Sequence, residues 1–184
     1  KGTTTYNTDY NMFIGYKSGQ VITTGTKNVF TGTHTGYSNT TASYGTMVGY
    51  NAGVNNTTGV SNSFLGYYAG YYNATGAQNT CLGNEAGNGV TGNSYSYNTF
   101  VGYRTGYATT TGSYNTVAGH SAGDSYSTPS NCTFLGYNAD ANGNAYSNAT
   151  ALGNGASVSA SNKIRLGNAT VTVIEGQVAY TFPS

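Results

Sequence analysis

The chain has 184 residues and a formal net charge of +1, and only 6% of its residues are Asp, Glu, Lys or Arg, against about 25% in an ordinary soluble domain. Gly, with 28 residues, is about twice as common as usual, whereas Leu, Ile, Val and Phe together make up roughly 15%, below the ~20% that normally supports a packed core. This balance excludes a basic surface for nucleic acid, and no run approaches the ~18 apolar residues that a membrane span needs.

Residues 1–10 do not belong to the repeat that follows, and we interpret them as a lead-in from a longer fibre. From Asn11 onward the chain divides into ten blocks of about 17 residues, typified by NSFLG at Asn62 and NTFVG at Asn98. Residues 11–161 form the repeat domain, and residues 162–184 form a C-terminal segment. The blocks begin at Asn11, Asn28, Gly45, Asn62, Asn79, Asn98, Asn115, Asn131, Asn148 and Asn162.

Each block opens with a short β-like stretch: Asn, a β-branched or small residue, two further mostly apolar residues, and Gly. Positions are numbered from this Asn, so that equivalent residues form columns along the repeat. The third column contains Phe13, Phe30, Met47, Phe64, Cys81, Phe100, Val117 and, after one inserted residue, Phe134. The fourth column contains Ile14, Thr31, Val48, Leu65, Leu82, Val101, Ala118, Leu135, Leu152 and Leu166.

The period predicts an all-β fold, a β-solenoid (β-roll) of about ten coils. Two strands of about four to six residues, with turns, account for one block, and successive coils stack ~4.8 Å apart. No window has the 3.6-residue apolar period of a helix, so we expect almost none. We expect each Asn to bond to its copy in the next coil and Gly to form the corners.

The third and fourth columns point to opposite faces of a strand, because successive side chains alternate. Both columns are apolar, yet a narrow solenoid has only one interior. A row of Phe left in water would be an interaction surface, so we expect the chain to associate side by side, most simply as a parallel homotrimer along a fibre axis. The alternative is a wider single solenoid whose corner buries both columns.

The coil pattern, Asn-x-apolar-x-Gly followed by Ala-Gly, resembles the β-roll heads of trimeric autotransporter adhesins and the repeats of phage tail-fibre shafts. The blocks at Asn62 and Asn98 are the most similar, and the resemblance in period and pattern extends over about nine-tenths of the chain. The coil here is longer, and Phe or Tyr stands where the adhesin pattern often has small aliphatic residues.

The segment 162–184 resembles the stretch that precedes the intramolecular chaperone of phage tail spikes and fibres. The matching residues are Asn162, Ile164, Arg165, Leu166, Gly167, Asn168, Val171, Ile174, Gly176, Val178 and Tyr180. Members of that family release the chaperone by self-cleavage after a Ser. The resemblance therefore implies that Ser184 is the processed end of a mature fibre, with a tip at 176–184.

Residues suited to catalysis or metal binding are few and far apart, so we expect no enzyme activity, no cofactor and no metal site. His34 and His120 lie five blocks apart, and only copies from three chains could bring either one to a shared ion. Glu85 and Asp124 lie two coils apart, so a glycosidase pair would have to be built across subunits. Cys81 and Cys132 are three blocks apart, too far for a disulfide.

Tyr residues are the best candidates for ligand binding, since Tyr offers a flat apolar face and a hydroxyl group. Tyr37, Tyr71 and Tyr107 are a set at the tenth position of their blocks, and Tyr72 follows one of them. Three more candidates are Tyr95 and Tyr126, in the longer excursions at 88–97 and 124–130, and Tyr180 near the expected tip. The alternative is that the Tyr columns only stack coil on coil.

These features predict an extracellular trimeric attachment fibre, on a virion tail or a bacterial surface, that binds a cell-surface glycan or envelope receptor through several weak sites. Two alternatives remain. A polysaccharide-degrading tail spike would need clustered carboxylates. An ice-binding solenoid would need a flat Thr ladder, whereas the Thr runs at 40–41, 57–58 and 109–111 lie near coil corners without strict register.

Overall fold

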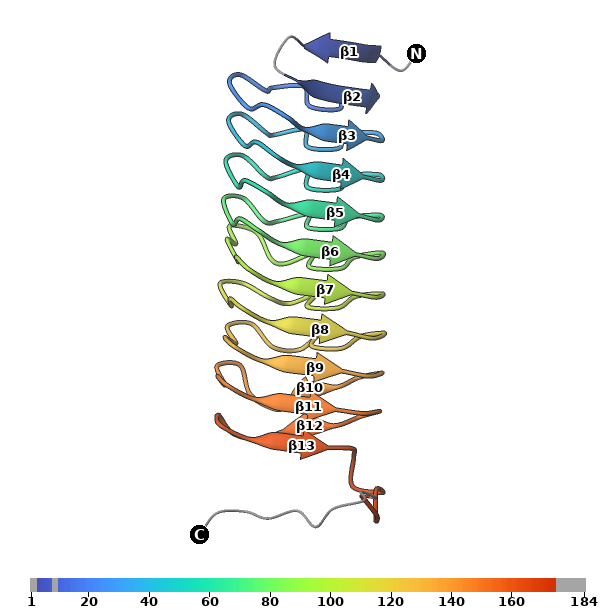
Figure 1. Cartoon of the computed structure of the whole chain (residues 1–184), viewed down its shortest axis with the longest axis vertical. Helices are drawn as coiled ribbons and strands as arrows, with labels where there is room; N and C mark the ends of the chain where they lie inside the picture. The colour runs from blue at the N-terminus through green and yellow to red at the C-terminus, as the bar shows by residue number, and fades with distance from the viewer. Residues whose placement is uncertain (1–2, 8–9, 175–184) are drawn as a thin grey trace.

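The computed structural model describes residues 3–7 and 10–174, which form a rod of stacked coils (Figure 1). Ten parallel strands lie side by side along the rod, one in each coil, and neighbouring strands are paired in register. They are β2 (Asn11–Gly15), β3 (Val29–Thr31), β4 (Thr46–Val48), β5 (Ser63–Leu65), β6 (Thr80–Leu82), β7 (Thr99–Val101), β8 (Thr116–Ala118), β9 (Thr133–Leu135), β11 (Thr150–Leu152) and β13 (Ile164–Leu166). None of the described residues is helical, and no helix there could cross a membrane. The prediction of an all-β solenoid is confirmed.

Three short strands complete the secondary structure. β1 (Thr3–Asn7) is antiparallel to β2 and covers the outer edge of that strand. β10 (Asp140–Ala141) and β12 (Ser157–Val158) pair in a second, parallel sheet. β13 lies in the segment 162–184 and pairs with β11, so the main sheet continues into that segment.

The expectation of two strands of four to six residues in each coil is wrong. Most coils contain one strand of three residues, and their polar halves are joined by isolated hydrogen bonds, such as that from the Thr40 N–H to the Thr57 carbonyl (2.9 Å). The reason is the backbone: His34 and Asn51 both have φ of 54°, and Gly36 has 56°. Residues in this left-handed region interrupt an extended strand.

The core is the third column, which points inward in the coils of β2 to β11. Phe30, Phe64 and Phe100 are completely buried, and Phe13 stacks on Phe30 with 5.1 Å between ring centroids. Opposite them lie small buried residues of the eighth column, such as Ala52 and Ala69. A layer of mostly large side chains against a layer of small ones, chiefly Ala and Thr, fills the narrow coil. The third column is therefore not the exposed row that could mediate association. The fourth column is the one left outside.

The first column forms the expected ladder of buried Asn side chains. Asn11 Oδ1 accepts from the Asn28 N–H at 2.9 Å, and the same bond recurs from Asn79 to Asn62. Each amide therefore satisfies a backbone donor of the following coil, which holds the corners in register.

The ladder changes near the C-terminal end, where the assignment of block starts to Asn131, Asn148 and Asn162 is wrong by one position. Cys132 and Ala149 occupy the ladder column, while Asn131 and Asn148 precede it with φ of 58° and 53°. Asn tolerates this left-handed conformation better than most residues, which explains why it is found at these corners.

Candidate functional site

The structure separates the seven candidate Tyr residues. Tyr37, Tyr71 and Tyr72 are half-buried on one surface of the rod, and the Tyr71 and Tyr72 rings meet edge to face with 4.5 Å between centroids. Tyr107 lies farther along the rod, where the Arg104 guanidinium covers its ring at 4.1 Å. Tyr180 lies outside the described residues.

Tyr95 and Tyr126 belong to the core, so their assignment as ligand-binding residues is wrong. Both are 0% exposed, and burial raises the pKa of each phenol well above its ordinary value. The Tyr95 hydroxyl donates to the Gly87 carbonyl and lies 3.7 Å from Cys81 Sγ. In this coil the small third-column residue leaves space that the Tyr side chain fills from the inserted loop. Tyr126 fills the coil of Val117 from a coil of ordinary length and packs on Phe134 with 5.1 Å between ring centroids.

An aromatic surface runs along the coils of β2 to β5, made by residues of the sixth, seventh, tenth and eleventh columns. Tyr16 and His34 lie edge to face at 5.5 Å, and His34 meets Tyr37 in the same manner at 5.6 Å. Farther along, Tyr68 stacks on Tyr71 with 4.5 Å between centroids. Only the contact between Tyr16 and His34 joins neighbouring coils, as the stacking alternative for Tyr expects. The other two lie within one coil and fix the rings of that coil against each other.

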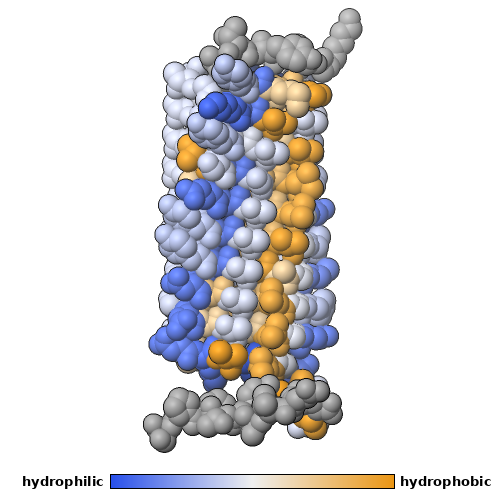
Figure 2. Space-filling model, in the orientation of Figure 1, coloured by the Kyte–Doolittle hydropathy of each residue, from blue (hydrophilic) through white to orange (hydrophobic). Residues whose placement is uncertain are grey.

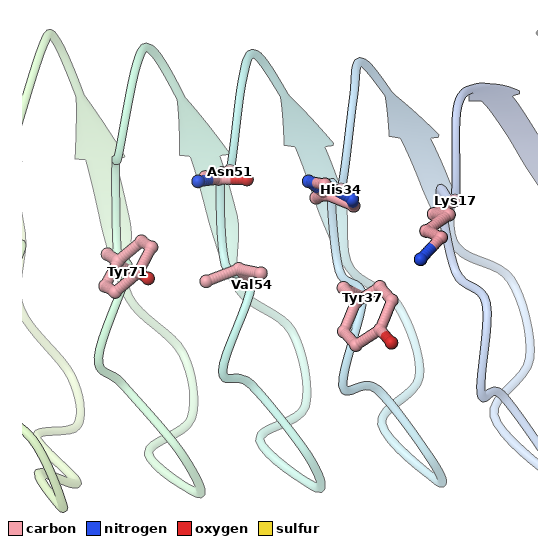
Figure 3. Close-up of a pocket in the computed structure, with 6 residues that line it drawn as sticks. All are labelled: Lys17, His34, Tyr37, Asn51, Val54 and Tyr71. Carbon is pink, nitrogen blue, oxygen red and sulfur yellow. The ribbon is translucent and has the colours of Figure 1, made fainter.

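A hollow of about 230 Å³ opens within this aromatic surface (Figure 3). Its lining residues come from four successive coils, after β2, β3, β4 and β5. They are Lys17, His34 and Asn51 from the seventh column and Tyr37, Val54 and Tyr71 from the tenth. Sequence reasoning identified the two Tyr residues but missed the role of the other four. The sequence does contain a sign of this site. The seventh and tenth positions are only three residues apart in each block, so their side chains from adjacent blocks lie side by side once the coils stack.

The outer face of the main sheet, which we call the strand face, consists of the second and fourth columns. Figure 2 shows a nearly continuous apolar stripe along it. The fourth column supplies the stripe, and Leu65 is 47% exposed. The second column places a row of hydroxyl side chains next to it: Thr46, Ser63, Thr80, Thr99, Thr116, Thr133 and Thr150. Sequence reasoning searched the Thr pairs at the corners and missed this ladder, which is in strict register.

The described ionisable groups form no site of three or more His, Cys, Asp and Glu side chains that could hold a metal ion. Glu85 faces Arg104, with 3.9 Å between Oε2 and Nε, rather than a second carboxylate. Cys81 and Cys132 are free thiols, as expected from their spacing. Burial raises the pKa of the Cys81 thiol to about 12, so it behaves as a small apolar side chain.

Comparisons with protein-family models, with curated proteins and with solved structures found no match to this chain. Two surfaces of the molecule are the candidates for function: the strand face and the hollow in the aromatic surface.

Asp140, in β10, is the carboxyl group with the clearest electrostatic signature. Burial raises its pKa to about 6, with a contribution from the charge of Asp124, while hydrogen bonds oppose the shift. The Ala141 N–H donates to Oδ1 at 2.7 Å, and the Ser125 N–H donates to Oδ2 at 3.2 Å. The folded chain thus holds the Asp140 proton more tightly than the unfolded chain does.

We therefore expect Asp140 to make the free energy of unfolding fall by up to about 3 kcal/mol as pH rises from about 4 to about 6. Its contribution is complete below the unfolded-state pKa and is lost as pH passes the raised folded-state value. Asp140→Asn removes the charge and should be more stable than wild type at neutral pH but not in acid. Urea unfolding across this range measures the effect, and parallel pH profiles for the two proteins would contradict it.

Proposed function

We propose that this chain is a segment of an extracellular attachment fibre in which three parallel copies associate through their strand faces. The observation that supports this proposal is the row of exposed aliphatic side chains along the rod, including Ile14, Leu65, Leu82 and Leu152. A continuous apolar stripe of this length is unusual on a monomer surface and is typical of an interaction surface.

A second copy of the chain is the partner that fits this stripe. Its side chains recur once in every coil, so a parallel copy presents the same side chains at the same ~4.8 Å interval and can match it coil by coil. From β2 to β11, the second and fourth columns contain no ionisable side chain. Burying this face therefore leaves no charged group without water or a partner. Three such stripes meeting on one axis give the trimer that the resemblance to adhesin and tail-fibre repeats implies.

Attachment follows from what such a rod presents on its other surfaces. The residues of the aromatic surface follow the strands in sequence and belong to neither the second nor the fourth column, so association through the strand face does not use them. Each copy then displays the same aromatic site, and several weak contacts with a cell-surface glycan or envelope component act together. The resemblance of the coil pattern to adhesin and tail-fibre repeats is the reason for placing this fibre on a virion tail or a bacterial surface.

Leu65→Asp combined with Leu82→Asp tests the association. We expect wild type to sediment at three times the 19.0 kDa of one chain, and the double variant to associate at least about 100-fold more weakly, because a carboxylate buried without a partner costs several kcal/mol. Val60→Asp, at another exposed aliphatic residue off the strand face, is the control and should leave the mass unchanged. A well-folded wild-type chain that sediments as a monomer would overturn the proposal.

Ice binding is a second candidate, favoured by the Thr ladder of the strand face. Thr80, Thr99 and Thr116 repeat in register on three adjacent strands and are all exposed. A flat, regular row of hydroxyl and methyl groups can order water on its surface, but only if no other copy covers it. An ice-recrystallisation assay at the concentration used for the mass measurement therefore separates the two candidates.

A further inference from the structure

The hollow exists because a Val interrupts a column of Tyr. Tyr37, Val54 and Tyr71 occupy the same position in three successive coils, so the two Tyr residues are attached ~10 Å apart with the shorter side chain between them. Figure 3 shows Val54 between the two rings, facing the open space. A third ring at this position would fill the gap.

Both rings are held in place before any ligand arrives. Tyr37 meets the His34 ring at 5.6 Å and 88°, and Tyr71 is packed between Tyr68 and Tyr72, with 4.5 Å between centroids in each case. Rings fixed in this way lose little entropy on binding. Their flat faces suit the C–H face of a pyranose, while the hydroxyl groups remain available to the sugar.

The polar lining favours a negative charge. Lys17 extends its ammonium group to 5.8 Å from the centroid of the Tyr37 ring, and none of the six lining residues is acidic. Asn51 is only 7% exposed, and its Oδ1 has no hydrogen-bond partner among the described residues. Rotation of this amide presents either its oxygen or its nitrogen to the hollow, so a ligand hydroxyl can supply the missing bond.

We propose that the hollow binds one residue of an acidic saccharide, a pyranose that carries a carboxylate. In this arrangement the carboxylate faces Lys17, a hydroxyl group bonds Asn51, and the sugar ring lies over Val54 between Tyr37 and Tyr71. The volume of about 230 Å³ is below that of pockets for drug-sized ligands, so it holds a single ring and the rest of the saccharide lies outside. The proposal depends on the proposed attachment function and names its ligand class.

The test uses the wild-type chain with 3′-sialyllactose and trigalacturonic acid as acidic probes, and lactose and maltotriose as neutral ones. Saturation-transfer NMR should show contacts from aromatic protons to the acidic probes, with titrations giving at least about fivefold tighter binding for these than for the neutral pair. Lys17→Gln should remove most of this preference, so that the acidic probes bind with an affinity close to that of the neutral pair. Equal binding of the acidic and neutral probes, or none of either, would overturn the proposal.

Val54→Tyr tests the location, since Tyr at both neighbouring coils shows that the fold accommodates a ring in this column. It should weaken binding of the acidic probes at least tenfold with an unchanged thermal midpoint. Val90→Tyr, at an exposed Val outside the hollow, should bind as wild type does. If Val54→Tyr binds normally, the hollow is not the site, although attachment by another surface stands. Sedimentation of the Leu65→Asp, Leu82→Asp double variant tests the fibre proposal independently of the saccharide-binding results.

Discussion

Gly66→Ala should destabilise the solenoid by about 3–6 kcal/mol, because the backbones of two coils approach too closely at this corner for any side chain. A Cβ on Gly66 would lie 2.2 Å from the Gly83 carbonyl oxygen and 2.6 Å from its carbon. The φ of +142° adds strain that L-residues rarely accept. Since the same contact repeats from Gly83 to Gly102, the coil spacing itself depends on these glycines.

Gly92→Ala is the matched control for this substitution. Its φ is +86°, also unfavourable for Ala, but a Cβ there would meet nothing within 4 Å. The control should therefore lose only about 1–2 kcal/mol from the backbone conformation. Guanidinium unfolding of both variants at one protein concentration measures the difference, and equal losses would show that the close approach between coils is not what limits this position.

Asn98→Ala should cost about 3–5 kcal/mol, because the Asn98 side chain joins the end of its own coil to the start of the next. Its Nδ2 donates to the Gly112 carbonyl at 2.9 Å, and its Oδ1 accepts from the N–H and the side-chain amide of Asn115, both at 2.9 Å. The residue is 1% exposed, so Ala leaves the Gly112 carbonyl and the Asn115 N–H buried without these partners. Each buried group left without a hydrogen-bond partner lowers the free energy of unfolding by about 1–3 kcal/mol.

Asn56→Ala separates hydrogen bonding from burial. Asn56 is also completely buried, yet neither its Oδ1 nor its Nδ2 has a partner among the described residues. Loss of this side chain should change the free energy of unfolding by no more than about 1 kcal/mol, since the amide makes no bond to offset its desolvation. If both variants lose the same free energy, the ladder of the first column is not a source of stability.

The two surfaces used in the functional proposals follow from this construction. Stacking fixes every column as a straight row, so one exposed apolar residue per coil becomes a stripe and one missing ring becomes a hollow. Association through the strand face would leave the aromatic surface free, and each additional copy would add one more hollow. A rigid rod with a repeated weak site gains its affinity from the number of copies.

Features that depend on alternation along a strand could be predicted from the sequence, whereas features that depend on side-chain volume could not. Phe30 and Thr31 were placed on opposite faces of a strand, which the structure confirms, but periodicity could not say which face was inside. Tyr95 resembled a surface loop residue because it follows an insertion. Its burial depends on the space that the small Cys81 side chain leaves in the coil. The size of that space cannot be read from the order of residues in the sequence.

The amino-acid sequence by itself determined the all-β solenoid, the coil length, the Asn ladder and the alternation along each strand, because these depend on repetition at fixed spacing. Only the tertiary structure decided that the third column fills the interior, that Thr and aliphatic rows share the outer face, and that Lys17, Asn51 and Val54 line one hollow. The physical reason is that these features depend on side-chain volume and on contacts between successive coils, which exist only once the coils are stacked.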